Sequence, residues 1–390
     1  MRAIELFAGA GGLGIGVSQA GFTPLAVVEW DRWCCSTIRD NRARGVAPVA
    51  RWPIPIEGDV RQVDFRKHEG KIALVSGGPP CQPFSLGGKH RAHDDDRDMW
   101  PEAVRVVRET KPEAFIFENV KGLTRASFAT YFAYIVHQLT YPEIARRVDE
   151  GWEDHLSRLE RHHTGRRRGA GGLVYRVVPR LLNAANFGVP QRRERVVFVG
   201  FRADLGVEWS FPEETHSLEA LLWDQAFGDY WDRHRVPRKA RALPPRHEAR
   251  AAKMDQRPVT LPWRTTRDAI SDLPDPERER EASSALFNHN FQPGARSYPG
   301  HTGSPLDEPA KTLKAGVHGV PGGENMLLNP DGSVRYFTVR ESARLQTFPD
   351  DYAFNGAWSE AMRQLGNAVP VELAALIARN IRAELVGAGA

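Results

Sequence analysis

Residues 3–16 of the chain, AIELFAGAGGLGIG, decide its fold. Residues 3–7 predict a strand, and the glycines of 9–16 predict a turn that opens a helix reaching about residue 20. Glycines in such a turn let backbone amides approach a ligand closely, and their spacing, GxGxxG, is typical of dinucleotide-binding folds. Taken alone, this spacing fits NAD, FAD or S-adenosylmethionine.

Strand-like and helix-like segments alternate along the N-terminal half, which predicts an α/β fold built on a doubly wound parallel sheet. We expect further strands at 24–29, 72–76, 114–117 and 195–201, and helices from Asp31 onward and over 100–109. Helical periodicity returns near the C-terminus, at 338–345 and 372–385.

Two stretches interrupt this alternation. Residues 124–170 are polar and favour helix, so we expect a mostly solvated helical insertion there. Residues 211–334 are rich in Pro, Gly, Arg and aromatic residues, which predicts a second, smaller and irregular domain. The expected organisation is a main domain over 1–205, the second domain over 211–334, and a segment over 335–390 that returns to the main domain.

Composition narrows the class of protein. The 390 residues are 41% hydrophobic, which supports an ordinary globular core, and no apolar run is long enough to span a bilayer. We therefore expect a soluble cytoplasmic protein without an export signal or a membrane partner. Three cysteines make no disulfide framework. The net charge of +4 is carried mainly by arginine, which suits phosphates and guanine edges, although a GC-rich genome would give the same excess.

One cysteine stands in a setting that suits a nucleophile. Residues 77–85 are GGPPCQPFS, so Cys81 follows an expected strand and is flanked by prolines that fix the backbone on both sides. A loop rich in Gly, His and charge follows over 85–97. The alternative is a buried cysteine that acts as a small apolar residue.

A carboxylate and two arginines are expected near this cysteine. Glu118 follows the strand 114–117, and ligand groups in open α/β sheets lie at the carboxyl ends of strands. Glu118 and Cys81 would form a general acid and nucleophile pair. Alternation places Arg193 and Arg195 on one face of a strand, where they would hold a carbonyl oxygen and lower the thiol pKa. A helix cap by Glu118 and a salt-bridge ladder along the strand are the alternatives.

Aromatic residues around the glycine turn favour S-adenosylmethionine over a dinucleotide. Phe7 precedes the turn, and Trp30 follows Glu29 at the end of the next strand. Glu29 could accept hydrogen bonds from ribose hydroxyls, Trp30 could cover an adenine, and Asp59 could accept from its amino group. Core packing of Trp30 is the alternative.

Six motifs follow one another in order along the chain. They are FAGAGG (7–12), PPCQ (79–82), ENV (118–120), QxRxR (191–195), RExARLQ (340–346) and GNAVP (366–370). The set resembles the DNA cytosine-5 methyltransferases over most of residues 1–200 and 334–375. The resemblance implies an S-adenosylmethionine-dependent methyltransferase fold, a Rossmann-like sheet whose second domain recognises the DNA target.

The resemblance also implies the chemistry. Cys81 adds to C6 of a cytosine flipped out of the duplex, and Glu118 protonates or hydrogen-bonds N3, so that C5 takes the methyl group of S-adenosylmethionine. The products are 5-methylcytosine and S-adenosylhomocysteine, and no metal is needed. The remaining implied roles are holding the base O2 (Arg195), supporting the thiolate or substrate (Arg193), positioning the cysteine loop (Asn119) and accepting from the exocyclic amine (the Pro80 carbonyl).

The implied cofactor residues are Phe7, Gly9, Gly11, Gly12, Glu29, Trp30, Asp59 and Asn367. Since Asn367 belongs to the last motif, the C-terminal helix should fold back against the N-terminal strand. The loop 85–97 is the candidate lid, with Ser85, Lys89 and Arg91 as DNA contacts, and 301–323 is the candidate recognition loop.

The predicted function is therefore a bacterial DNA cytosine-5 methyltransferase, the modification half of a restriction-modification pair. It would act as a monomer on double-stranded DNA, beside a restriction endonuclease for the same site. The same chemistry on tRNA is the alternative, disfavoured by the long second domain. A nicotinamide oxidoreductase leaves Cys81, Glu118 and Arg195 unexplained, and an inactive DNA-binding module leaves every catalytic position unexplained.

Overall fold

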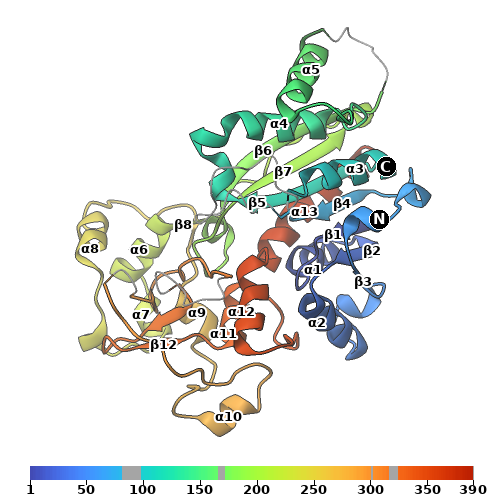
Figure 1. The fold of residues 1–390 in the computed structure, drawn as a ribbon. Helices are drawn as coiled ribbons and strands as arrows, with labels where there is room; N and C mark the ends of the chain where they lie inside the picture. The colour runs from blue at the N-terminus through green and yellow to red at the C-terminus, as the bar shows by residue number, and fades with distance from the viewer. Residues whose placement is uncertain (81–97, 166–171, 300–301, 316–323, 390) are drawn as a thin grey trace. The chain divides into compact units, whose positions relative to one another are not determined.

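A computed structural model of the chain describes residues 1–80, 98–165, 172–299, 302–315 and 324–389 (Figure 1). The chain forms two compact units, each assembled from separated stretches. The first unit comprises residues 1–182, 194–212 and 375–390, and the second comprises 183–193 and 213–374.

The first unit is built on a seven-stranded sheet with the order β3-β2-β1-β4-β5-β7-β6. Its strands are β1 (Arg2–Leu6), β2 (Thr23–Glu29), β3 (Ile56–Glu57), β4 (Leu74–Gly77), β5 (Ala114–Val120), β6 (Tyr175–Asn183) and β7 (Glu194–Arg202). The pairs from β3 through β5 are parallel, whereas β7 runs antiparallel to β5. The expected α/β sheet is present, but it is mixed rather than wholly parallel, because β7 reaches β5 through β6 instead of a crossover helix.

Helices cover both faces of this sheet, as alternation along β1 shows. Ile4 and Leu6 belong to a buried cluster with α3 (Trp100–Thr110) and α4 (Ala129–Thr140), in which Trp100 makes edge contacts with the rings of Phe117 and Phe198. Glu5, between them, points to the other face, where α1 (Gly12–Gln19) lies. The helix α2 (Arg32–Ala43) packs beside β2, and Asp31 caps its first turn.

The stretch expected to be a solvated insertion belongs largely to this core. The helix α4 buries Tyr131, Tyr134, Ile135 and Leu139 in the same cluster as the sheet. The next helix, α5 (Trp152–Gly165), docks on α4 through a hydrogen bond from Tyr134 to His155 and through the buried Leu159. The expectation of solvation was therefore wrong for α4, whose apolar residues stand at helical spacing among aromatic ones. The strand β6 was not expected at all.

The second unit has little regular sheet. Its strands are the short β8 (His216–Ser217), β9 (Leu261–Pro262), β10 (Ser304–Pro305), β11 (Met326–Leu328) and β12 (Val334–Tyr336). Its helices are α6 (Leu218–Phe227), α7 (Tyr230–Arg233), α8 (Pro245–Ala251), α9 (Thr266–Ile270), α10 (Arg280–Ser284), α11 (Val339–Leu345) and α12 (Trp358–Asn367). The last helix, α13 (Val371–Gly387), begins in this unit and continues into the first.

The two units divide the C-terminal segment differently from the sequence-based boundaries. Residues 335–374 pack with the second unit, because the buried side chains of Gln191 and Arg193 donate to the carbonyls of Leu345 in α11 and Gly366 in α12. Only residues 375–390 join the first unit, where Ile381 is fully buried and Arg382 lies against Gly21 just before β2. The C-terminal helix therefore does reach the N-terminal part of the sheet.

None of the helices in the described part of the chain combines the length and apolar character that crossing a bilayer requires.

Candidate active site

Three segments that carry predicted site residues follow one row of paired residues in the sheet. Leu6 of β1 pairs with Gly77 of β4, and Gly77 pairs with Phe117 of β5. The strands are so close here that a Cβ on Gly77 would lie 2.7 Å from the Leu6 carbonyl oxygen. Since β1 and β4 are neighbours at which the strand order reverses, this row is the switch point where open α/β sheets bind ligands.

The glycine turn after β1 takes a conformation that few residues tolerate. Phe7, Gly9 and Gly11 all have positive φ, of 51°, 55° and 90°. Phe7 is the exception to the usual glycine at such angles, and strained backbone of this kind clusters at ligand sites. Gly12 is the first residue of α1, so the turn delivers the helix N-terminus to the strand end.

Glu29 holds this turn in place. Its Oε2 accepts from the Gly9 N–H at 2.7 Å, and its Oε1 accepts from the N–H groups of Trp30 and Asp31 at 2.9 and 2.8 Å. Burial raises the pKa of Glu29, and these three backbone bonds oppose the rise. One lone pair on Oε2 is left for a ribose hydroxyl, so the carboxylate can both brace the turn and bind a ligand.

Two other predicted cofactor residues flank Glu29. Trp30 is 68% exposed, which rules out core packing and leaves its ring open to stack on a ligand. Asp59 follows Gly58, whose N–H bonds the Glu29 carbonyl. The Asp59 carboxylate, however, accepts hydrogen bonds from both Nε and Nη2 of the Arg61 guanidinium, and this pairing lowers its pKa. An adenine amino group would have to share or displace Arg61.

The loop that leads to the cysteine is anchored by Asn119. The Asn119 Nδ2 donates to the Pro79 carbonyl at 3.0 Å. The Pro80 carbonyl accepts a long bond of 3.4 Å from the Met99 N–H. Cys81 itself, together with Ser85, Lys89, Arg91 and the candidate lid 85–97, lies outside the described residues.

Glu118 and Arg195 form a buried ion pair beside that loop. The Arg195 Nε lies 2.6 Å from Glu118 Oε1, and both side chains are about nine-tenths buried. The pairing follows from the antiparallel register, in which Arg195 stands opposite Val120, two residues from Glu118. Burial lowers the pKa of the Arg195 guanidinium, and the carboxylate opposes this.

The carboxylate of Glu118 has a different neighbour at each oxygen. Its buried Oε1 contacts the Arg195 guanidinium at 2.6 Å. Its Oε2 lies 3.2 Å from where a Cβ on Gly78 would stand, next to the start of the cysteine loop. Such a carboxylate can accept a bond or share a proton with a group brought into the site.

Arg193 does not stand where the sequence predicted. Alternation suggested that it would join Arg195 and support the thiolate or substrate. Instead its fully buried guanidinium donates to the carbonyls of Leu313 and Gly366 at 3.1 and 2.7 Å, inside the second unit. Asn367, the remaining predicted cofactor residue, ends α12 in that same unit.

A buried acid that the sequence analysis did not single out lies beneath the glycine turn. Glu5 is 2% exposed, contacts the Ser76 hydroxyl, and lies against Gly14 of α1. Burial raises its pKa to about 8. A charged residue between the apolar Ile4 and Leu6 of a central strand was the signal that could have identified it.

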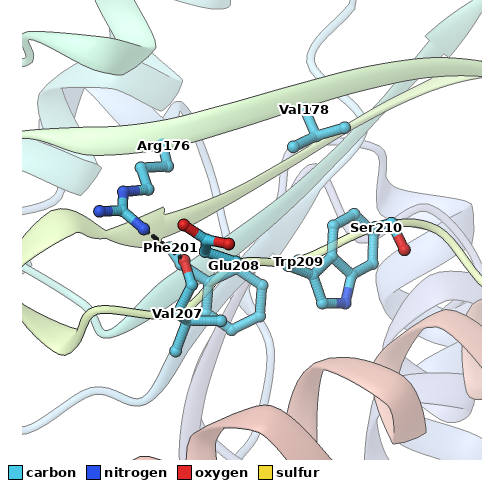
Figure 2. Close-up of a pocket in the computed structure, with 7 residues that line it drawn as sticks. All are labelled: Arg176, Val178, Phe201, Val207, Glu208, Trp209 and Ser210. Atoms are coloured by element: carbon cyan, nitrogen blue, oxygen red, sulfur yellow. Dashed lines mark hydrogen bonds between the residues drawn. The ribbon is translucent and has the colours of Figure 1, made fainter.

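One cavity among the described residues lies away from this row of strand ends. It holds about 440 Å³ beside β6 and β7, and Figure 2 shows the Arg176, Trp209 and Glu208 side chains around it. None of the predicted site residues lines it.

Comparison with known proteins decides the family. The model of the C-5 cytosine-specific DNA methylases matches residues 1–141 and 169–383. The chain belongs to this family. Its enzyme class is DNA (cytosine-5-)-methyltransferase, as the motifs predicted. The residues between the two matched stretches, 142–168, include α5, so the insertion relative to the family is shorter than the expected 124–170.

Bacterial relatives span nearly the whole methylase chain. The chain is 32% identical to the Type II methyltransferase M.PspPI of Psychrobacter sp. (strain TA137) over 97% of its own length and 78% of that protein's. It is 30% identical to M.NgoMIV of Neisseria gonorrhoeae, with 97% and 96% covered.

Solved structures show the same fold. A putative DNA modification methyltransferase encoded within an E. coli prophage superposes with a TM-score of 0.60 and 21% identity over 99% of both chains. The S. pombe Dnmt2 methyltransferase superposes with a TM-score of 0.56 and 16% identity, covering 99% of this chain and 98% of that one.

Proposed function

We propose that this methylase transfers a methyl group to C5 of a cytosine flipped out of duplex DNA within a short specific sequence. We further propose that it is the modification enzyme of a bacterial restriction-modification system, which makes a nuclease for the same site its counterpart. The observation that carries the proposal is the row Leu6–Gly77–Phe117, which starts the glycine turn, the cysteine loop and the Glu118 segment side by side.

The first strand end fits S-adenosylmethionine. The turn has positive φ at Phe7, Gly9 and Gly11, Glu29 keeps one acceptor position for a hydroxyl, and the Trp30 ring is exposed. The residues that would hold the cofactor are Phe7, Gly9, Gly11, Gly12, Glu29, Trp30, Asp59 and Asn367. The bound cofactor supplies the methyl group as an electrophilic sulfonium. We propose no metal.

The chain's own residues would make C5 of cytosine nucleophilic. In this proposal the Cys81 thiolate forms a bond to C6 while Glu118 shares a proton with N3, which moves electron density to C5. Arg195, ion-paired with Glu118, would hold the base O2. After methyl transfer the C5 proton is lost to a base, and the electron pair of that C–H bond restores the ring double bond as the sulfur leaves.

Asn119 and Pro80 would serve this step through the backbone. Asn119 bonds the Pro79 carbonyl, two residues before the nucleophile, and would fix the direction from which the thiolate approaches. The Pro80 carbonyl would accept from the exocyclic amine, exchanging its 3.4 Å bond with the Met99 N–H for a stronger one.

Duplex DNA would be recognised by the second unit. The target must leave the stack before residues at a strand end can reach it, at a cost of a few kcal/mol. We assign the candidate lid 85–97 and its residues Ser85, Lys89 and Arg91 to DNA contact, and the neighbourhood of 301–323 to sequence recognition. The protein would act in the cytoplasm as a monomer.

Bisulfite sequencing of a methylation-free bacterial host that expresses the protein tests the proposal. We expect one short motif to be protected, no protection with Cys81→Ser, and unchanged protection with Cys34→Ser, which makes the same chemical change in α2. Absence of any protected cytosine, although the folded protein methylates tRNA in competition with duplex DNA, would overturn it in favour of RNA as the substrate.

A further inference from the structure

Side chains of the QxRxR motif bond both backbone groups of Leu313, its N–H and its carbonyl. Gln191 Oε1 accepts from the Leu313 N–H at 3.1 Å, and Arg193 Nη1 donates to the Leu313 carbonyl at 3.1 Å. Gln191 and Arg193 are both fully buried. The stretch ahead of Leu313 also pairs with the motif, since the Arg192 N–H bonds the Ala310 carbonyl at 2.8 Å and the Thr312 hydroxyl bonds the Arg192 carbonyl at 2.6 Å.

The same arginine also binds the last turn of α12, which carries Gly366 and Asn367. Arg193 Nη2 donates to the Gly366 carbonyl at 2.7 Å. Gly366 lies so close to the segment after Leu313 that a Cβ there would stand 2.4 Å from the Ala315 backbone nitrogen. Any side chain at this position would push the two segments apart, so the glycine of GNAVP serves close backbone contact.

A second set of bonds joins Lys314 to Asn325. Asn325 accepts from the Lys314 N–H and donates to the Lys314 carbonyl, both at 3.0 Å. The Lys314 ammonium also pairs with Glu324 at 2.7 Å. Residues 314 and 325 are therefore held together, at the base of the part of the second unit to which we assign sequence recognition.

These side chains bond to backbone groups, so they fix the path of the chain at residues 313 and 314 without requiring particular side chains there. The main-chain groups of Leu313 and Lys314 keep their partners whatever side chains stand around them, so the recognition residues can differ while the base of the segment keeps its place. Because the gripping side chains are buried, removing one leaves a main-chain group without a partner.

We propose that Gln191 and Arg193 are positioning residues that couple DNA binding to cofactor binding, by joining segment 312–315 to the Gly366–Asn367 turn. The proposal rests on the proposed function, which assigns DNA recognition to the neighbourhood of the segment and cofactor binding to Asn367. A ligand that orders either partner lowers the cost of ordering the other, since one guanidinium bonds both carbonyls. Arg193 is thus not a catalytic residue.

The test compares the affinity for S-adenosylhomocysteine with and without saturating duplex that carries the recognition sequence, by titration calorimetry. We expect duplex to tighten cofactor binding at least about fivefold in the wild-type protein. In Arg193→Lys, where one ammonium replaces a fork that spans two carbonyls, the ratio should fall to within about twofold of one, while each ligand alone still binds.

Arg340→Lys is the matched control. Arg340 is 2% exposed and donates to the carbonyls of Phe287, Pro349 and Tyr352, so it is a comparably buried arginine that braces other parts of the second unit. It should keep the wild-type ratio at a comparable loss of thermal stability. Gln191→Met, which loses its bonds to Leu313 and Leu345, gives the same test if Arg193→Lys does not fold.

Coupling that survives in Arg193→Lys or Gln191→Met would overturn the proposal. So would an equal loss in Arg340→Lys, or wild-type protein whose cofactor affinity ignores DNA. Methylation by the wild-type protein is measured separately by bisulfite sequencing, which distinguishes failure of the coupling from failure of the proposed function.

Discussion

The two units position their functional groups by different means. In the first unit, the register of the strands sets the positions. Leu6, Gly77 and Phe117 are paired in one row, so the segments that follow them start at the same edge of the sheet. In the second unit, short strands give little register, and buried polar side chains hold the backbone at chosen points, as Gln191 and Asn325 do. The many backbone hydrogen bonds of a sheet tolerate the loss of one side chain, whereas a segment held by single buried side chains loses its position when one of them is removed.

The largest expected effect is on catalysis in the first unit. Glu118→Gln keeps the size of the side chain but removes the proton-sharing carboxylate, so methyl transfer should fall by about 10²- to 10⁴-fold. Loss of the anion also leaves Arg195 buried without its ionic partner. Single-turnover methyl transfer at saturating DNA and cofactor measures the effect.

A control separates chemistry from folding in that experiment. Lys121→Met removes an exposed ion pair with Glu194 in the same strand neighbourhood and should leave the rate within about twofold. If Glu118→Gln kept the wild-type rate, the strand-end row would not be the catalytic edge.

The stability of the second unit should depend strongly on single buried polar side chains. Glu341 accepts from both Nη atoms of Arg335 and from the Thr338 N–H, and it is 2% exposed. Breaking such a buried pair from one side costs about 3–5 kcal/mol, so Glu341→Gln should lower the free energy of unfolding by that order. Urea unfolding followed by tryptophan fluorescence measures it.

The neighbouring pair of Arg344 with Asp350 gives the comparison for that variant. The Asp350 side chain is 58% exposed, so Asp350→Asn should cost no more than about 1 kcal/mol. Equal losses of unfolding free energy in the two variants would mean that the burial of an ion pair does not decide how much it stabilises the unit.

Glu5 gives the first unit a dependence on pH. Its pKa is raised by burial from 4.5 to about 8, so the folded protein keeps a proton that the unfolded chain releases above its ordinary pKa. Stability should therefore fall as pH rises from about 4.5 to 8, by about 1.4 kcal/mol per pH unit and up to about 5 kcal/mol over the whole interval. Glu5→Gln should remove that fall.

Urea denaturation of wild type and Glu5→Gln at pH 5.5 and 8.0 measures the effect of Glu5. The difference between the two proteins should be greater at pH 8.0, with Glu5→Gln the more stable there. A difference that does not change with pH would show that Glu5 titrates alike in the folded and unfolded chain.

The smallest effect is expected from packing of α1 on the sheet. A Cβ on Gly14 would lie 2.8 Å from the Trp52 ring, which is 2% exposed and bonded to the Ser18 hydroxyl. Overpacking should outweigh the gain in helix propensity, leaving Gly14→Ala less stable by about 1 kcal/mol. Thermal unfolding should show no comparable loss for Gly387→Ala, a helical glycine with open space around it. A stabilised Gly14→Ala would mean that the ring moves freely.

The sequence predicted the first unit well because its information is local. The strands β1, β2, β4, β5 and β7 lie within three residues of their expected bounds, since each is a short apolar run bounded by glycine or a polar residue. The strand β6 was missed because Arg176, Pro179 and Arg180 break its alternation. The order of six motifs was enough to predict the family.

What the sequence could not supply is contact between distant residues. Arg193 fits the alternation expected of a strand, yet its partners lie 120 and 173 residues later in the sequence. No pattern near position 193 predicts them. Likewise, no local pattern told whether Trp30 was packed or exposed, or that Arg61 would pair with Asp59.

Covalent trapping tests the account most directly. When the wild-type protein and S-adenosylmethionine meet duplex DNA with 5-fluorocytosine at the target, fluorine cannot leave C5 as the proton does, so the thioether at C6 should persist. We predict a one-to-one adduct on Cys81 by mass spectrometry, formed more slowly by Glu118→Gln. An adduct on another residue, or methylation of ordinary cytosine by a protein that forms no adduct, would contradict the account.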